Sequence, residues 1–201
     1  MIEQFEPIPE GEIAQILAPL EELPYHNRDH IAGVRAAIKQ LARLSGISGK
    51  MLNLMDIAVL FHEVGIPQGR ENHEKKGTEI AVNYLRKHGF SPEDIDIVNR
   101  FILVTKGEPE GDRPFVTHPK DIYEKIICDA DLAILGADEY TFSKANNALQ
   151  KELGETDRKS WIGKQISFLK GHNYHTEKAI KLWDAGKAKN LERLQHLYGM
   201  L

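Results

Sequence analysis

The stretch from Ile57 to Gly65 constrains this chain more than any other. An apolar run from Ile57 to Phe61 leads directly into the adjacent residues His62 and Glu63, and Gly65 follows as a helix stop. Residues this apolar lie inside a helical bundle, so we expect the pair at the inner end of a core helix. Burying a carboxylate beside a histidine is costly unless a cation or hydrogen-bond donors compensate. The stretch therefore raises the hypothesis of a metal site, which needs ligands from elsewhere in the chain.

The composition is that of an ordinary soluble globular protein. The chain has 201 residues, 41% hydrophobic and 28% charged, which is enough for one domain with a sizeable core. A net charge of −4 gives no global sign of nucleic-acid or membrane-surface binding. The start of the chain lacks the features of a signal peptide, and no apolar stretch approaches the roughly 20 residues that span a bilayer. A single cysteine fits a reducing compartment, so we expect a cytoplasmic protein.

Apolar side chains recur at helical spacing along most of the chain, which predicts an all-α fold. Residues 1–9 are expected to be an extended lead-in, and residues 106–117, rich in Gly, Pro and Glu, the longest loop. No strand alternation is convincing. The chain is thus expected to be one irregular helical bundle over residues 1–201, with its core motifs in 20–140 and additional helices in 141–201. The expected helices span about 29–45, 48–65, 71–88, 91–105 and 119–136, followed by three or four more that are broken at Gly154, Gly171 and Gly186.

Residues from different expected helices offer a metal-ligand set. His30 begins one helix, His62 and Glu63 end the next, and Asp131 lies on a later one. Imidazoles and carboxylates together suit Mn, Fe, Ni, Co or Zn better than Ca or Mg. Taken singly, a histidine near a core is more often hydrogen-bonded than metal-bound, and a carboxylate at a helix end is usually a cap or half of an ion pair. The metal hypothesis therefore depends on the joint pattern.

Four motifs follow one another along the chain: Tyr25-His26-Asn27-x-x-His30-Ile31, Leu60-Phe61-His62-Glu63-x-Gly65, Asn72-His73-Glu74-x-x-Gly77 and Asp129-Ala130-Asp131-Leu132-x-Ile134-Leu135-Gly136. In their order and spacing they resemble the HD-domain metal-dependent phosphohydrolase superfamily, in particular a subgroup of small predicted bacterial HD phosphohydrolases. The resemblance covers roughly residues 20–185. It implies an all-helical fold of HD-domain type, built around a His…His-Asp…Asp metal set.

By position, the resemblance makes His30 and His62 the two histidine ligands and Asp131 the distant aspartate. Asp129 competes for that last role, although the Ala-Asp-x-Leu pattern favours Asp131. The departure is Glu63, which stands where the family has the aspartate that names it. Glutamate keeps the charge, but its carboxylate lies one methylene, about 1.5 Å, further out. The metal would then shift, become bidentate or be lost, which bears on activity more than on fold.

Further candidate site residues lie within these motifs and, for Lys106, outside them. His73 and Glu74 are expected to act in catalysis as a proton shuttle, to orient the ligands, or to bind a second ion. The alternative for this pair is a solvated first turn of a helix. His26, Arg28 and Lys106 are expected to bind substrate, and a surface charge is the alternative for the last two.

The resemblance implies hydrolysis at phosphorus of a small compound such as a nucleotide or phosphomonoester, with one divalent transition metal and room for a second ion. Because of Glu63, the alternative function is a catalytically degenerate HD domain that binds a nucleotide or a protein partner without turnover. A purely structural, oligomeric helical protein has no sequence feature in its favour, and the sequence does not set the oligomeric state. Cys128 follows Ile126 and Ile127 on an apolar helix, so we expect a buried structural thiol.

Overall fold

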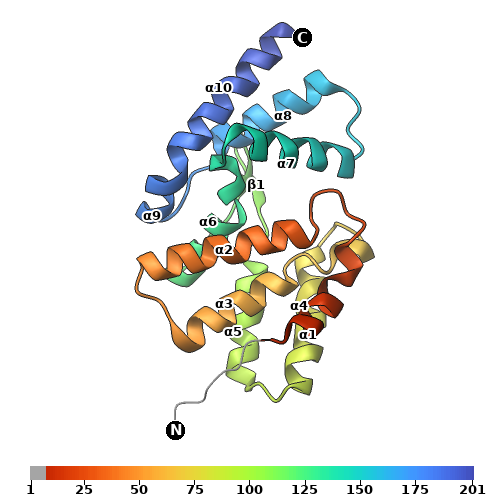
Figure 1. Cartoon of the computed structure of the whole chain (residues 1–201), viewed down its shortest axis with the longest axis vertical. Helices are drawn as coiled ribbons and strands as arrows, with labels where there is room; N and C mark the ends of the chain where they lie inside the picture. The colour runs from red at the N-terminus through yellow and green to blue at the C-terminus, as the bar shows by residue number, and fades with distance from the viewer. Residues whose placement is uncertain (1–7) are drawn as a thin grey trace. The chain divides into compact units, whose positions relative to one another are not determined.

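The computed structural model describes residues 8–201 and divides the chain into two compact units, up to Lys106 and from Gly107 onward. Each unit is built mainly of helices (Figure 1), which confirms the predicted all-α class. Most of the expected lead-in at 1–9 lies outside the described residues. That the chain forms a single domain stays a prediction. In the described part of the chain, no helix is both long and apolar enough to cross a membrane.

The first unit is organised around α3 (Gly49–Phe61), which is buried without interruption from Ile57 to Phe61. This helix packs against α1, α2, α4 and α5. Its end differs from expectation, because it stops at Phe61 and His62 is the capping residue, so Glu63 lies just beyond the helix. The elements of this unit are α1 (Glu10–Leu17), the 3₁₀ turn η1 (Ala18–Leu20), α2 (Arg28–Leu44), α3 (Gly49–Phe61), the 3₁₀ turn η2 (Ile66–Gln68), α4 (His73–Lys87) and α5 (Pro92–Leu103).

Two ion pairs fix how these helices meet. Arg35 of α2 donates from Nε and Nη2 to the two carboxylate oxygens of Asp56 on α3, at 2.8 and 2.7 Å. Such a two-point contact between half-buried partners restricts both the distance and the orientation of the helices. At the other end of α3, Lys50 lies 2.8 Å from the buried carboxylate of Asp94 on α5. Of the two pairs, the one between Arg35 and Asp56 joins the two helices that carry predicted ligands, which are thus held by a side-chain ion pair as well as by apolar packing.

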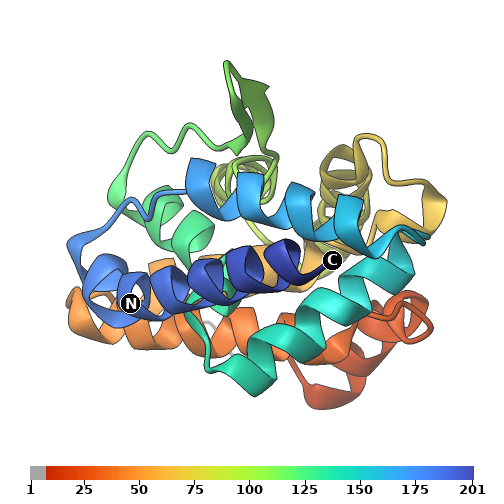
Figure 2. The same ribbon diagram turned by 90° about the horizontal axis from the view of Figure 1, so that it is seen from above.

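The second unit has a core of Leu135, Phe142, Ile162, Leu169 and Leu194. Its helices α8 (Arg158–Gly171) and α10 (Ala185–Met200) pack together and run side by side in Figure 2. The elements are β1 (Glu108–Glu110), β2 (Arg113–Val116), α6 (Ile122–Asp131), the 3₁₀ turn η3 (Ala133–Gly136), α7 (Glu139–Glu152), α8 (Arg158–Gly171), α9 (Glu177–Ala179), the π-helical stretch η4 (Ile180–Asp184) and α10 (Ala185–Met200).

Two sequence expectations are wrong in this unit. The loop at 106–117 contains an antiparallel hairpin of β1 and β2 that turns at Gly111, whose φ is 57°. Its strands are too short for alternation of apolar and polar residues to appear in the sequence. Gly186 does not break a helix but lies in the first turn of α10. A Cβ at this position would lie 2.1 Å from the carbonyl oxygen of Gly136. That glycine permits a close backbone approach.

Candidate metal centre

In the first unit, imidazoles surround the carboxylate of Glu63, which is only 5% exposed. Its Oε1 lies 3.2 Å from Nε2 of His62 and 3.9 Å from Nε2 of both His26 and His30. Its Oε2 lies 3.1 Å from Nε2 of His73. Ligand atoms of His30, His62 and Glu63 fall within 4.8 Å of one another. The structure thus brings together five residues that the sequence singled out.

Asn27 positions the upstream histidines. Its Oδ1 accepts from the backbone N–H of Asp29 at 2.9 Å and of His30 at 3.4 Å, which makes it the N-cap of α2. Its Nδ2 donates to the carbonyl oxygens of Leu23 and Pro24, tying the preceding turn to the same cap. His30 therefore lies in the first turn of α2. The sequence shows Asn27 as a residue of capping type just before a helical stripe, but did not lead us to predict its role in positioning His26 and His30.

His62 has a fixed tautomer. Its Nδ1 lies 2.8 Å from the carbonyl oxygen of Val59, and since that oxygen can only accept, Nδ1 carries the proton. In the neutral ring, Nε2 is then an acceptor facing the Oε1 acceptor of Glu63. Two acceptors at this distance need a positive species between or beside them, either a proton or a metal ion. A histidine whose Nδ1–H is tied to a backbone carbonyl is the usual arrangement of a metal ligand.

His73, the first residue of α4, contacts the carboxylate of Glu63. Its Nδ1 lies 2.9 Å from the carbonyl oxygen of Arg70, which leaves Nε2 for Glu63. The preceding Asn72 has a φ of 55°, a left-handed conformation that asparagine tolerates better than most residues. Two glycines allow the approach, because a Cβ on Gly65 would lie 2.1 Å from the His73 carbonyl oxygen and one on Gly77 would lie 2.4 Å from that of Phe61. The sequence predicted Gly65 only as a helix stop.

The charges of the cluster depend on one another. Burial alone raises the pKa of Glu63, but His62, His26 and a hydrogen bond from His73 outweigh it and lower the pKa well below its ordinary value. Burial lowers the pKa of His73, yet the hydrogen bond and attraction of Glu63 outweigh it and raise that pKa. A carboxylate kept ionised in a buried site, with imidazoles around it, is a set of groups that suits a transition metal.

The remaining predicted residues of this unit behave differently. Glu74 is 7% exposed and lies 3.5 Å from Nε2 of His73, so a solvated first turn does not describe it. Arg28 pairs at 3.7 Å with Glu21, and both side chains are exposed. Lys106 is exposed beyond the end of α5. That Arg28 and Lys106 bind substrate stays a prediction.

In the second unit, the two competing aspartates differ in their surroundings. Asp129 is fully buried, and it accepts from the N–H of His175 at 2.6 Å and from the N–H and hydroxyl of Thr176 at 2.9 and 2.7 Å. Burial raises the pKa of Asp129, and these bonds partly offset the effect. Its carboxylate is thus committed to holding the start of α9. Asp131 is the last residue of α6 and is partly exposed, and its role as a metal ligand stays a prediction.

The buried structural thiol predicted for Cys128 is confirmed. The side chain is 3% exposed, and burial raises its pKa to about 12. A thiol that stays protonated at neutral pH is a poor nucleophile.

Two solved structures share the fold of this chain. One, described as a predicted HD superfamily hydrolase from an uncultured Thermotogales bacterium, is 19% identical with a TM-score of 0.58, over 95% of this chain and 92% of that one. The other, a protein from Lactobacillus plantarum, is 16% identical with a TM-score of 0.65, over 96% of this chain and 98% of that one. No protein-family model and no curated protein matches the sequence. The chain therefore has an HD-domain fold, as the motifs predicted.

Proposed function

We propose that this protein is a metal-dependent phosphohydrolase that acts on a small phosphorylated compound such as a nucleotide or a phosphomonoester. The observation that carries the proposal is the buried carboxylate of Glu63, which four imidazoles approach with their Nε2 atoms. The fold shared with an HD superfamily hydrolase supports it. The single cysteine, buried and reduced, fits a cytoplasmic location.

We assign His30, His62 and Glu63 as ligands of one divalent transition metal, Mn, Fe, Ni, Co or Zn, on the basis of their convergence in the first unit. The motif pattern of the sequence adds Asp131 as a further ligand. When bound, such an ion polarises a phosphoryl oxygen and lowers the pKa of a bound water toward neutrality.

The chain's own residues then have separable roles. His73 is held at Nδ1 by Arg70, so it can gain and lose a proton at Nε2 without losing its orientation. Buried Glu74 lies close enough to stabilise the protonated form of His73. His26, partly exposed at the rim of the cluster, is suited to contact a substrate phosphate. We propose His73 and Glu74 as the proton-transfer pair and His26 as a substrate contact.

Metal analysis by plasma mass spectrometry tests this function. Protein purified without chelator or nickel resin is expected to carry about one transition metal per chain, and to release phosphate from a phosphate-ester library when that ion is supplied. His62→Ala should lose both properties. His118→Ala is the matched control, since His118 is 70% exposed in the second unit and pairs only with the exposed Glu110 among the residues described.

The alternative function has a different signature. Absence of metal after soaking with Mn, Fe, Co, Ni and Zn, together with thermal stabilisation by nucleotides and no phosphate release, would overturn the hydrolase and support binding without turnover. The observation that favours this alternative is the glutamate at position 63, where the family motif has an aspartate.

A further inference from the structure

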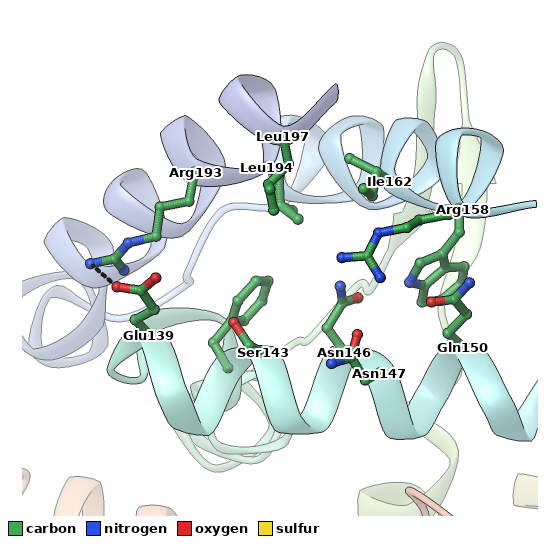
Figure 3. Close-up of a pocket in the computed structure, with 12 residues that line it drawn as sticks. Glu139, Ser143, Asn146, Asn147, Gln150, Arg158, Ile162, Arg193, Leu194 and Leu197 are labelled. Atoms are coloured by element: carbon green, nitrogen blue, oxygen red, sulfur yellow. Dashed lines mark ion pairs between the residues drawn. The ribbon is translucent and has the colours of Figure 1, made fainter. Parts of the chain in front are cut away.

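A pocket of about 90 Å³ lies in the second unit, between α7, α8 and α10 (Figure 3). None of its lining residues belongs to the metal cluster. At about 10–15 Å³ for each water-sized occupant, it has room for roughly six to nine non-hydrogen atoms. That is the size of a small organic molecule.

Two buried polar groups of this pocket have no hydrogen-bond partner among the residues described. Trp161 is 3% exposed and lines the pocket, and its indole Nε1 is buried without an acceptor. Asn146 also lines the pocket, and its Oδ1 is buried without a donor. An orphaned polar group costs about 1–3 kcal/mol. Neither atom is reached by solvent, so each side chain must turn slightly to contact an occupant of the pocket. The amide of Asn146 can also turn over to present Nδ2, and both side chains can then donate to one acceptor.

Of the three charged residues that line the pocket, two form an ion pair with each other and the third is a cation without an ion-pair partner among the residues described. Glu139 and Arg193 lie at one end and pair with each other at 3.2 Å, as the dashed line in Figure 3 marks. At the other end, Arg158 has no ion-pair partner within residues 8–201. Figure 3 shows its guanidinium extending over the pocket toward Asn146. The free donors of the pocket therefore gather at one end, and they include a positive charge.

The rest of the lining is mixed, with Ser143, Asn147 and Gln150 on its polar side and Phe142, Ile162, Leu194 and Leu197 on its apolar side. Phe142, Ile162 and Leu194 belong to the core of the unit and also line the pocket. The apolar side gives no partner to a hydrated inorganic anion, whereas it stabilises an apolar group by excluding water.

We propose that this pocket binds a small organic monocarboxylate with an apolar body. The carboxylate accepts from the guanidinium of Arg158, the indole N–H of Trp161 and the amide of Asn146. The apolar body lies against Phe142 and Ile162. This assignment concerns a binding site separate from the proposed phosphohydrolase site and does not depend on it.

Two-dimensional ¹H–¹⁵N NMR of the full chain provides the test, because only two tryptophans, Trp161 and Trp183, give indole resonances. The probes are hexanoate, its neutral isostere hexanamide, and inorganic phosphate. Titration with hexanoate should shift the Trp161 resonance, assigned with Trp161→Phe, to saturation while the Trp183 resonance stays in place. Hexanamide should bind about tenfold more weakly or worse, since it lacks the charge that Arg158 recognises.

Arg158→Gln should weaken hexanoate binding by about tenfold or more. Because Arg158 is exposed and unpaired, this variant should keep the native spectrum. Lys144→Gln is the matched control, an exposed cation of α7 that does not line the pocket, and it should leave binding unchanged. The proposal is overturned by an unshifted Trp161 resonance at saturating millimolar hexanoate, by equal binding of hexanamide, by an Arg158→Gln variant that binds normally, or by phosphate that binds as well as hexanoate.

Discussion

Oε2 of Glu63 lies 3.1 Å from Nε2 of His73, which joins the residue just beyond α3 to the first residue of α4. An aspartate at this position would withdraw the carboxylate by about 1.5 Å and lengthen that contact beyond hydrogen-bond range. The glutamate that departs from the family pattern therefore has a neighbour suited to its length.

Glu63→Asp is expected to reduce metal affinity and phosphate release by about tenfold or more, because a displaced ligand and its partner both lose their geometry. The raised pKa of His73 should fall toward its ordinary value, since its hydrogen bond to Glu63 is the main cause that raises it. Isothermal titration with Mn or Zn measures the first effect and the ¹H–¹⁵N correlations of the imidazole ring the second. A large gain in activity would instead identify a decayed site that aspartate repairs.

Asp129→Asn should lower the stability of the protein, whereas Asp131→Asn should lower its metal content. Asp129 is fully buried and accepts from both His175 and Thr176, so its amide variant should lose about 2–4 kcal/mol of the free energy of unfolding. Asp131→Asn should change that free energy by less than about 1 kcal/mol but lower the metal content. Urea unfolding and metal analysis of both variants check this. Metal loss in Asp129→Asn without destabilisation would reverse the two roles.

Gly77→Ala is expected to destabilise the protein by about 1–3 kcal/mol, because its Cβ would have to displace the Phe61 carbonyl oxygen, 2.4 Å away. The shift of α4 should also weaken metal binding through His73. Gly33→Ala is the control, an exposed helical site with open space around the added Cβ, and it should stabilise by about 0.5–1 kcal/mol. Thermal unfolding that ranks the two variants equally would contradict the proposed close approach of α3 and α4.

His172 should make stability fall in mild acid. Burial, together with the nearby Lys187 ammonium, lowers the pKa of His172 from 6.5 to about 3. Between those values the unfolded chain binds a proton that the native protein does not, so stability is present above pH 6.5 and declines as the pH falls. From pH 7 to pH 5 this residue should cost about 2 kcal/mol. Urea unfolding of His172→Gln should show a loss smaller by that amount, and an identical pH dependence would refute the assignment.

The sequence by itself determined the helical framework and one half of the candidate site. The spacing of apolar residues, the apolar content and the capping residues all act within one or two helical turns. For this reason α2, α4 and α5 begin and end within two residues of the positions expected from the sequence. The same local signals predicted that His62 and Glu63 lie at the inner end of the most apolar helix. The HD-type motifs added the fold, which the two solved structures confirm.

Only the tertiary structure decided which side chains share a space. His26 and His73 approach Glu63 because α2 and α4 pack on α3, and glycines at 65 and 77 leave room for that packing. Asp129 is committed to Thr176, far along the chain. These contacts depend on how distant helices meet, and the free energy of that packing is spread over many residues, so no local pattern records them.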